Sequence, residues 1–184
     1  PNGDGDAKSA NLPVKFSEKE HLTWKTAMPG KAWSSPVVMD NKVWFTNAEE
    51  NGHKMWAVQL DWKSGKKLNE ILVFENKEPQ FCHPMNSYGT PTPVIYGGKV
   101  FVHFGAHGTA ALDAKSGKKI WERRDFKCDH FRGAAASPIV YEDTLIVHFD
   151  GHDLQYIVCL DQKTGSTLWK KDREYDFKTD NGAV

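Results

Sequence analysis

Short hydrophobic runs alternate with polar turns along this chain at the spacing expected of β-strands. The runs at 42–47, 99–104 and 144–149 are rich in Val, Leu, Phe and other β-favouring residues, and each follows an Asn, Gly or Asp. Such runs predict extended strands, because β-branched and aromatic side chains pack well on a pleated backbone. The chain is therefore predicted to be all-β.

One short pattern occurs three times along the chain. Leu-Asp-x-x-Ser/Thr-Gly begins at Leu60, Leu112 and Leu160, with a hydrophobic run before the Asp and another after the Gly. This is typical of a hairpin whose Gly takes a positive φ and whose Asp bonds nearby backbone N–H groups. We assign a turn-forming role, rather than a catalytic one, to Asp61, Gly65, Asp113, Gly117, Asp161 and Gly165.

A second repeated step, Ser or Thr followed by Pro and two hydrophobic residues, precedes each hairpin at Ser35, Thr92 and Ser137. Together the two patterns predict four strands per unit. The predicted strands are 34–39, 42–47, 54–61 and 66–74; 91–96, 99–104, 108–114 and 118–124; and 136–141, 144–149, 154–161 and 166–172. Four antiparallel strands per repeat are typical of a β-propeller blade.

The predicted organisation is a partial β-propeller of three four-stranded antiparallel blades. The segment at 20–28 contains Leu22-Thr23-Trp24, which matches the last strand of a blade but follows no hairpin, so we predict an orphan strand that completes the last blade of a ring. The predicted parts are a turn-rich lead-in (1–19), the orphan strand (20–28), blades at 33–75, 91–125 and 134–172, an inserted loop (76–90) and a linker (173–184).

Three blades and a spare strand do not close a ring, since propellers need about four to eight blades. We therefore expect the chain to be the N-terminal part of a protein with about seven or eight blades, whose other blades are its neighbours.

Composition excludes some partners and leaves others open. The 184 residues include 24 basic and 24 acidic side chains, so no net charge favours nucleic acid or an anionic membrane. No window approaches the roughly 18 uninterrupted apolar residues of a membrane helix, and the first residues lack the features of a signal peptide. Three isolated cysteines do not fix the compartment.

The segment from Ala110 to Trp121 resembles the tryptophan-docking repeat of the pyrroloquinoline-quinone-like β-propellers, and the third repeat matches it nearly as well. The resemblance implies that a Trp at the end of each pattern packs against the adjacent blade. The docking residues it implies are Trp24, Trp121 and Trp169. In the first repeat Asn69 stands at the docking position, and Trp44, Trp56 and Trp62 are the candidates to take its place.

Residues 132–138, 78–88 and 1–5 further resemble a group of exported propeller proteins abundant in planctomycete-type bacteria. The resemblance implies a periplasmic or otherwise extracytoplasmic address and a non-catalytic scaffold that binds a protein or a cell-envelope polymer at the axial face. Two alternatives stay open: part of a quinoprotein dehydrogenase with pyrroloquinoline quinone and calcium, and the sensor region of a signalling protein. The chain lacks the adjacent cysteine pair common in such dehydrogenases, and we expect no cofactor.

Two loops that enter the inner strands combine cysteine with histidine. The candidate binding residues on them are Cys82, His83, Asn86, Tyr88, Cys128, His130 and Arg132. Thiolate and imidazole are plausible zinc or copper ligands, and a Cys82–Cys128 disulfide is an alternative if the protein is exported. Phe81, Met85 and Tyr88 could form an apolar binding patch, or else cover the ends of the blades.

The remaining histidines and the first acidic residues suggest little chemistry. His103 and His148 occupy equivalent places in Val-His-Phe steps, which favours a structural role over a ladder of ligands at the axis. Asn2, Asp4 and Asp6 alternate like the first ligands of a calcium loop, but Ala7 stands where such a loop needs Gly.

Overall fold

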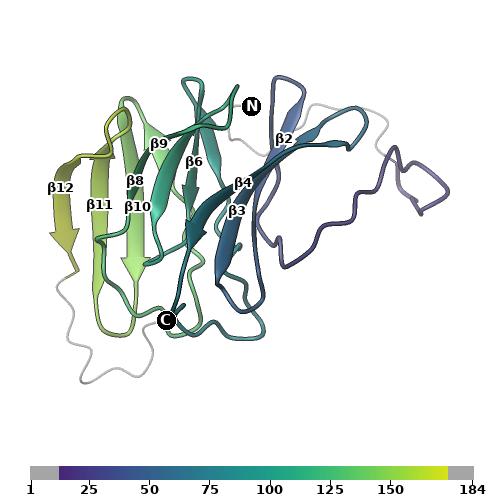
Figure 1. The fold of residues 1–184 in the computed structure, drawn as a ribbon. Helices are drawn as coiled ribbons and strands as arrows, with labels where there is room; N and C mark the ends of the chain where they lie inside the picture. Colours follow the sequence, from purple (N-terminus) through teal and green to yellow (C-terminus); the bar gives the residue numbers. More distant parts are fainter. Residues whose placement is uncertain (1–12, 174–184) are drawn as a thin grey trace.

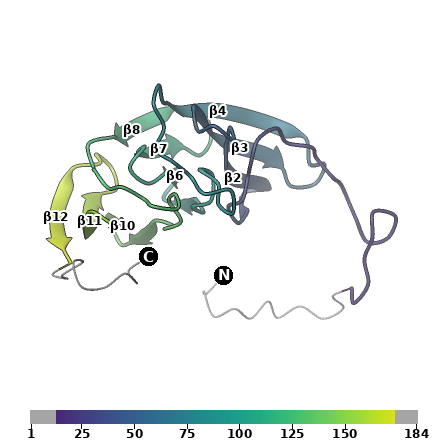
Figure 2. The same cartoon turned by 90° about the horizontal axis from the view of Figure 1, so that it is seen from below.

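The computed structural model describes residues 13–173, which form three four-stranded antiparallel sheets arranged as a fan (Figures 1 and 2). The first blade contains β1 (Val37–Met39), β2 (Lys42–Ala48), β3 (Lys54–Asp61) and β4 (Lys67–Glu75). The second contains β5 (Val94–Tyr96), β6 (Lys99–His103), β7 (Thr109–Asp113) and β8 (Lys119–Arg123). The third contains β9 (Ile139–Tyr141), β10 (Thr144–Asp150), β11 (Gln155–Asp161) and β12 (Thr167–Asp172). The predicted all-β partial propeller is confirmed.

Within each blade the strands follow one another in sequence order, so every neighbouring pair is an antiparallel hairpin. The first strands of successive blades contact one another, β1 with β5 and β5 with β9. Figure 2 shows the last strands, β4, β8 and β12, along the outer rim of the arc. These twelve strands match the predicted ones closely, except at the start of each blade.

The first strand of each blade is shorter than predicted because proline sets its start. β1, β5 and β9 begin directly after Pro36, Pro93 and Pro138. Proline has no N–H to donate to a neighbouring strand, so regular pairing starts only beyond it.

The residue before each of these prolines joins one blade to the next. The Ser35 N–H donates to the Thr92 hydroxyl at 3.0 Å, and the Thr92 N–H donates to the Ser137 hydroxyl at 2.9 Å. The repeated Ser/Thr-Pro step therefore links the blades near the axis.

The orphan strand predicted at 20–28 pairs with no strand among residues 13–173. A strand requires hydrogen bonds from a neighbour, and the blade that this segment is predicted to complete lies outside the described residues, so the orphan strand stays a prediction. The segment is held by packing instead, since Trp24 and Met28 lie against a small core on the first blade that contains Val43 and Leu60.

Two larger cores lie between the blades. One combines Trp44 and Phe74 of the first blade with Phe104 of the second. The other combines Phe101 of the second blade with Phe149 of the third. Successive blades therefore bury their facing sheet surfaces against each other, as in other repeat architectures.

The Leu-Asp-x-x-Ser/Thr-Gly pattern forms the turn between the last two strands of each blade. In the second blade the Asp113 carboxylate accepts hydrogen bonds from the Ser116 N–H at 2.7 Å and from the Ser116 hydroxyl at 2.7 Å, and Gly117 has a φ of 73°. These hydrogen bonds lower the pKa of the Asp113 carboxyl. The other two turns repeat the arrangement with Ser64 and Thr164.

Two tryptophans lie on the turn glycines of the next blade. Trp121 lies over Gly165, where a Cβ would come within 2.7 Å of the indole, and its Nε1 donates to the Gln162 carbonyl at 3.0 Å. Trp24 repeats this arrangement on the first blade, over Gly65, with its Nε1 donating to the Trp62 carbonyl at 2.8 Å.

The joint between the first and second blades is built differently. Ile71 lies over Gly117, and a Cβ there would come within 2.6 Å of the Ile71 side chain. The Ala114 carbonyl accepts a hydrogen bond from Gln59 Nε2 at 3.4 Å, and Asn69 in turn donates to Gln59 Oε1 at 2.6 Å. An aliphatic side chain and an amide pair thus stand where the other joints have one indole.

The three tryptophans considered as substitutes for Asn69 have other positions. Trp44 is buried in the core between the first two blades, although Ile71 makes the contact with the turn glycine. Trp56 lies in the small core with Trp24, and Trp62 supplies the carbonyl that Trp24 uses. Trp169 on β12 is 46% exposed.

Candidate binding face

Five loops meet at one end of the blades. They are the hairpin loops 49–53, 104–108 and 151–154 and the two connections between blades, 76–93 and 124–138. Because the strands alternate in direction, all five lie at the same end, which is the lower end in Figure 1 and faces the viewer in Figure 2. We call this end the loop face.

The two connections are joined through the backbone of Arg132. Its carbonyl accepts hydrogen bonds from Asn86 Nδ2 at 2.9 Å and from the His83 N–H at 3.4 Å, and the Cys82 Sγ lies 3.8 Å from the same oxygen. Asn86 Nδ2 also reaches the Ala134 carbonyl at 3.4 Å. The structure therefore brings the candidate residues of the two loops together.

Gln80 makes a second link that the sequence analysis missed. Its side-chain Nε2 donates to the Cys128 carbonyl at 3.0 Å, and its N–H donates to His107 Nε2 at 3.2 Å. The Tyr88 hydroxyl donates to the Gln80 carbonyl at 2.6 Å. No pattern in the sequence marks Gln80, because its partners come from three different loops.

Arg124 fixes the start of the second connection, and it too was missed. Its guanidinium donates to the Glu75 carbonyl at 3.2 Å, to Asn76 Oδ1 at 2.5 Å and to the His107 carbonyl at 3.1 Å. It also lies over the Phe74 ring, 5.2 Å from the centroid. The loop face is thus tied to the ends of both the first and the second blade.

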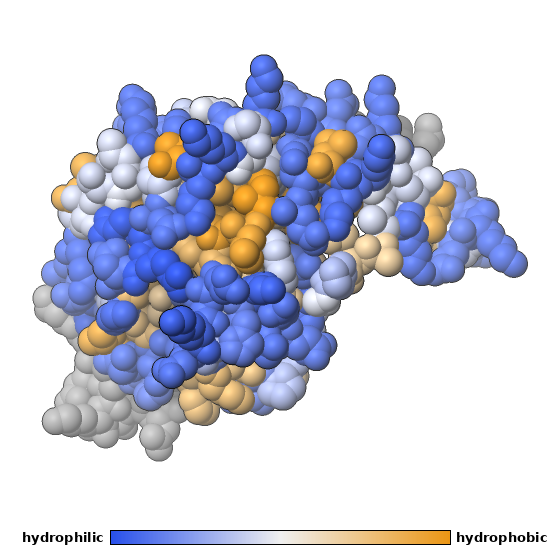
Figure 3. All heavy atoms as spheres, viewed as in Figure 1, coloured by the Kyte–Doolittle hydropathy of each residue, from blue (hydrophilic) through white to orange (hydrophobic). Residues whose placement is uncertain are grey.

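Three large hydrophobic side chains project from the joined connections. Phe81 is 65% exposed, Met85 is 83% exposed and Phe131 is 52% exposed. We call these three residues the apolar patch. Figure 3 shows a largely hydrophilic outer surface whose most hydrophobic atoms lie near the centre of the view, with a smaller and paler hydrophobic group at the lower edge.

Tyr88 does not belong to the apolar patch, contrary to one sequence-based expectation. It is buried in the core between the first two blades, and its ring lies against Gly52. Because its hydroxyl donates to the Gln80 carbonyl, Tyr88 anchors the first connection to the core between the first two blades.

A polar pocket lies beside the apolar patch. Its lining residues are Lys31, Glu49, Glu50, Cys82, His83, Pro84, Asn86, Ser87 and Tyr88. The Lys31 ammonium lies 3.7 Å from the Glu50 carboxylate. Burial raises the pKa of the Cys82 thiol, against a smaller opposing effect of Lys31, so the thiol is neutral at physiological pH.

Cys128 and His130 are buried beneath the loop face. The Cys128 Sγ lies 3.8 Å from His130 Nδ1 and 3.5 Å from the Leu154 carbonyl. Burial, aided by nearby Asp153, raises the pKa of the Cys128 thiol to about 12. Burial also lowers the pKa of His130.

The cysteine–histidine metal site and the disulfide considered above do not form here. Residues 13–173 contain no group of three His, Cys, Asp or Glu side chains placed to hold a metal ion. All three thiols are free. Cys82 points toward Gly133, whereas Cys128 lies against Gly151. The alternating Asn2, Asp4 and Asp6 lie outside the described residues.

His103 and His148, which are equivalent in sequence, differ in environment. His103 is fully buried between the second and third blades. His148 lies on the free face of the third blade, with its Nε2 3.3 Å from the Asp150 carboxylate. The sequence could not distinguish them, because the difference depends on which blade face has a neighbour.

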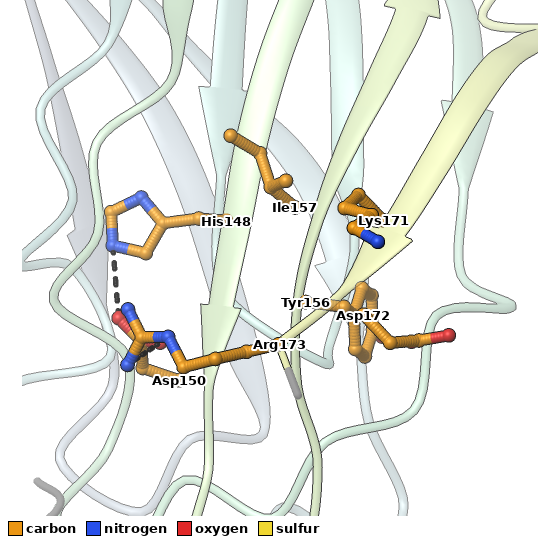
Figure 4. Close-up of a pocket in the computed structure, with 7 residues that line it drawn as sticks. All are labelled: His148, Asp150, Tyr156, Ile157, Lys171, Asp172 and Arg173. Carbon is orange, nitrogen blue, oxygen red and sulfur yellow. Dashed lines mark ion pairs between the residues drawn. The ribbon is translucent and has the colours of Figure 1, made fainter. Parts of the chain in front are cut away.

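A second pocket surrounds His148 (Figure 4). Its lining residues are His148, Asp150, Tyr156, Ile157, Lys171, Asp172 and Arg173. Arg173 approaches the Asp150 carboxylate at 3.6 Å and donates to Gln155 Oε1 at 2.8 Å. The pocket lies on the free face of the third blade, and one of its residues reaches the second connection, since the Tyr156 hydroxyl donates to the Lys127 carbonyl at 2.6 Å.

Comparison with protein families gives one match over most of the chain. Residues 14–182 match the family described as outer membrane protein assembly factor BamB. No curated protein matches the chain. Within residues 13–173, no helix is long and apolar enough to cross a membrane.

Several solved structures share the fold at low sequence identity. The quinohemoprotein alcohol dehydrogenase ADHIIG from Pseudomonas putida HK5 is 18% identical, with a TM-score of 0.58 over 81% of this chain and 22% of that protein. A europium-containing methanol dehydrogenase is 16% identical, with a TM-score of 0.56 over 86% of this chain and 27% of that one. BamB from Moraxella catarrhalis is 14% identical, with a TM-score of 0.53 over 81% of this chain and 42% of that one. The chain thus spans less than half the length of each relative.

Proposed function

The chain belongs to the outer membrane protein assembly factor BamB family, and from this premise we propose that it is part of a non-catalytic, extracytoplasmic propeller that binds a protein through its loop face. The likeness to quinoprotein dehydrogenases is one of fold alone, and fold does not determine chemistry.

The observation that carries the proposal is the apolar patch on two joined loops. Phe81 and Met85 come from one connection and Phe131 from the other, and the Arg132 carbonyl fixes the two connections to each other. Exposed aromatic and Met side chains are enriched at protein interfaces, and loops that are already fixed to each other lose little backbone entropy on binding. Their arrangement favours a protein partner over a strongly charged polymer.

Asn86 should hold the two connections together. Replacing Asn86 with Ala removes the hydrogen bonds to the Arg132 and Ala134 carbonyls, so we expect the free energy of unfolding to fall by about 1–2 kcal/mol. Amide exchange measured by mass spectrometry should also speed up in 76–90 and 124–138. Asn51→Ala, in a hairpin loop of the first blade, is the control. Unchanged exchange in both connections would show that they are not coupled through Asn86.

A binding experiment tests the proposed function. Full-length protein is immobilised and exposed to envelope extract of the source organism, and the retained proteins are quantified by mass spectrometry. We expect Phe131→Ser to reduce the retained partner about tenfold or more, as for an aromatic residue at the centre of an interface. Tyr96→Ser is the matched control, because Tyr96 is 48% exposed but lies beside the turn at the opposite end of its blade.

The outcome separates the loop face from other surfaces. Loss of the partner in Phe131→Ser with retention in Tyr96→Ser supports the proposal. Equal retention in both variants contradicts it. Reduction of a redox dye by the full-length protein with an alcohol or a sugar would favour a dehydrogenase instead.

A further inference from the structure

His103 is a buried imidazole with one unsatisfied nitrogen. It is the last residue of β6, and its Nδ1 lies 2.8 Å from the Thr109 hydroxyl. Its Nε2 is buried and has no hydrogen-bond partner among the described residues. Its ring meets Phe149 of the third blade edge to face, with centroids 5.3 Å apart. The imidazole therefore lies in the contact between the second and third blades.

The groups that act on His103 do not stabilise a positive charge there. Apart from Thr109, the side chains with an electrostatic effect on it are three other imidazoles, those of His130, His148 and His107. The carboxylates of Asp153, Asp129 and Asp150 favour a proton on His130 and not on His103. The positive charge of Arg124 disfavours a proton on His107. A proton on His103 would thus be both buried and without a counter-charge.

The same joint holds the second connection of the loop face. His130 stacks near Phe149, with ring centroids 6.3 Å apart. Its Nε2 is also buried without a partner and lies against Gly105, where a Cβ would come within 2.7 Å of it. Phe149 therefore contacts both His103 and the loop that carries Phe131. If the third blade separates from the second, this loop loses its packing against Phe149 and keeps its hydrogen bonds to the first connection.

We propose that the contact between the second and third blades is an acid-sensitive joint, which opens when His103 takes up a proton. The open state lets water reach the imidazole and frees Phe126 and His130 of the second connection from Phe149. The inference does not depend on the proposed function, since it concerns only how the two blades pack.

The direction of the pH effect follows from burial. Burial lowers the pKa of His103 from 6.5 to about 3. In the open state the imidazole is in water and has its usual pKa of 6.5, so it binds a proton more readily than in the closed state. The closed joint therefore loses stability as the pH falls below 6.5 and continues to lose it down to about 3. Between pH 7 and pH 5 this change corresponds to an increase of about 25-fold in the opening equilibrium.

Amide hydrogen exchange of the full-length protein tests the joint. Exchange is measured at pH 7 and pH 5 and corrected for the intrinsic pH dependence of the chemistry. In the wild type we expect opening within 124–138 and 144–161 to increase about 25-fold more than in His103→Asn. Asn retains a partner for Thr109 but does not titrate. His148→Asn, at the equivalent exposed position, is the matched control and should behave like the wild type.

Two results would overturn the inference. One is an equal pH response in the wild type and His103→Asn. The other comes from an NMR titration of the wild type, which does not depend on the variant folding: a His103 ring signal that titrates near pH 6.5 while the joint stays closed. A ring that stays neutral down to pH 5 in the closed state supports the proposal.

Discussion

Replacing Trp121 with Ala should lower the free energy of unfolding by about 3–5 kcal/mol, the usual cost of removing a large packed aromatic side chain. The indole covers Gly165, lies 6.0 Å from the Phe101 ring between centroids and donates to the Gln162 carbonyl. Its removal leaves a gap between the second and third blades and an unsatisfied carbonyl. Chemical denaturation followed by circular dichroism measures the loss.

Trp169→Ala is the matched control for this prediction. Trp169 occupies the same position in the third repeat but is 46% exposed, so its removal should cost less than about 1 kcal/mol in this chain. Similar losses for the two variants would contradict the docking role assigned to Trp121.

The second large effect is expected at the glycine beneath that indole. In Gly165→Ala the new methyl group would lie 2.7 Å from the Trp121 ring, and φ at this position is +74°. The positive φ alone costs about 1–2 kcal/mol for an L-residue, and displacing the indole should raise the total loss to about 3–4 kcal/mol. The free energy of unfolding from denaturant titration measures it.

Gly98→Ala separates the two contributions. Gly98 has the same φ of +74°, but a Cβ there meets nothing within 4 Å. Its substitution should therefore show the backbone cost of about 1–2 kcal/mol without the clash. If Gly165→Ala costs no more than Gly98→Ala, the indole does not press on the turn glycine as described.

The sequence was sufficient to predict the strands because their determinants are local. Alternating hydrophobic runs, the Asp and Gly of each turn and the Pro before each first strand act within a few residues. The orphan strand at 20–28 is a prediction of another kind. It depends on a neighbouring edge outside residues 13–173, which no local pattern can specify.

The candidate site was predictable only in part. The sequence placed Cys82 and Cys128 on two loops at the same end of the blades, and the structure brings these loops together. It did not identify Gln80 or Arg124, whose partners are backbone carbonyls and side chains far away in the sequence. Nor could it tell that Tyr88 is buried while Phe131 is exposed, since that depends on how the loops cross.

The joint at Asn69 shows how one repeat tolerates a missing docking residue. Ile71 covers the turn glycine, and the Asn69–Gln59 pair serves the carbonyl that an indole would otherwise bind. The two functions of the Trp, packing and hydrogen bonding, are thus divided among three side chains. A repeat can therefore lose its signature residue while its blade still packs against the next.

The most direct test of the central claim, that the loop face binds a protein, is photo-crosslinking in living cells. A photoreactive phenylalanine is placed in the full-length protein at position 131 on the loop face or at position 96 at the opposite end. We predict a discrete crosslinked protein partner from position 131 and none from position 96. Crosslinking from position 96 alone, or the same product from both positions, would contradict the account.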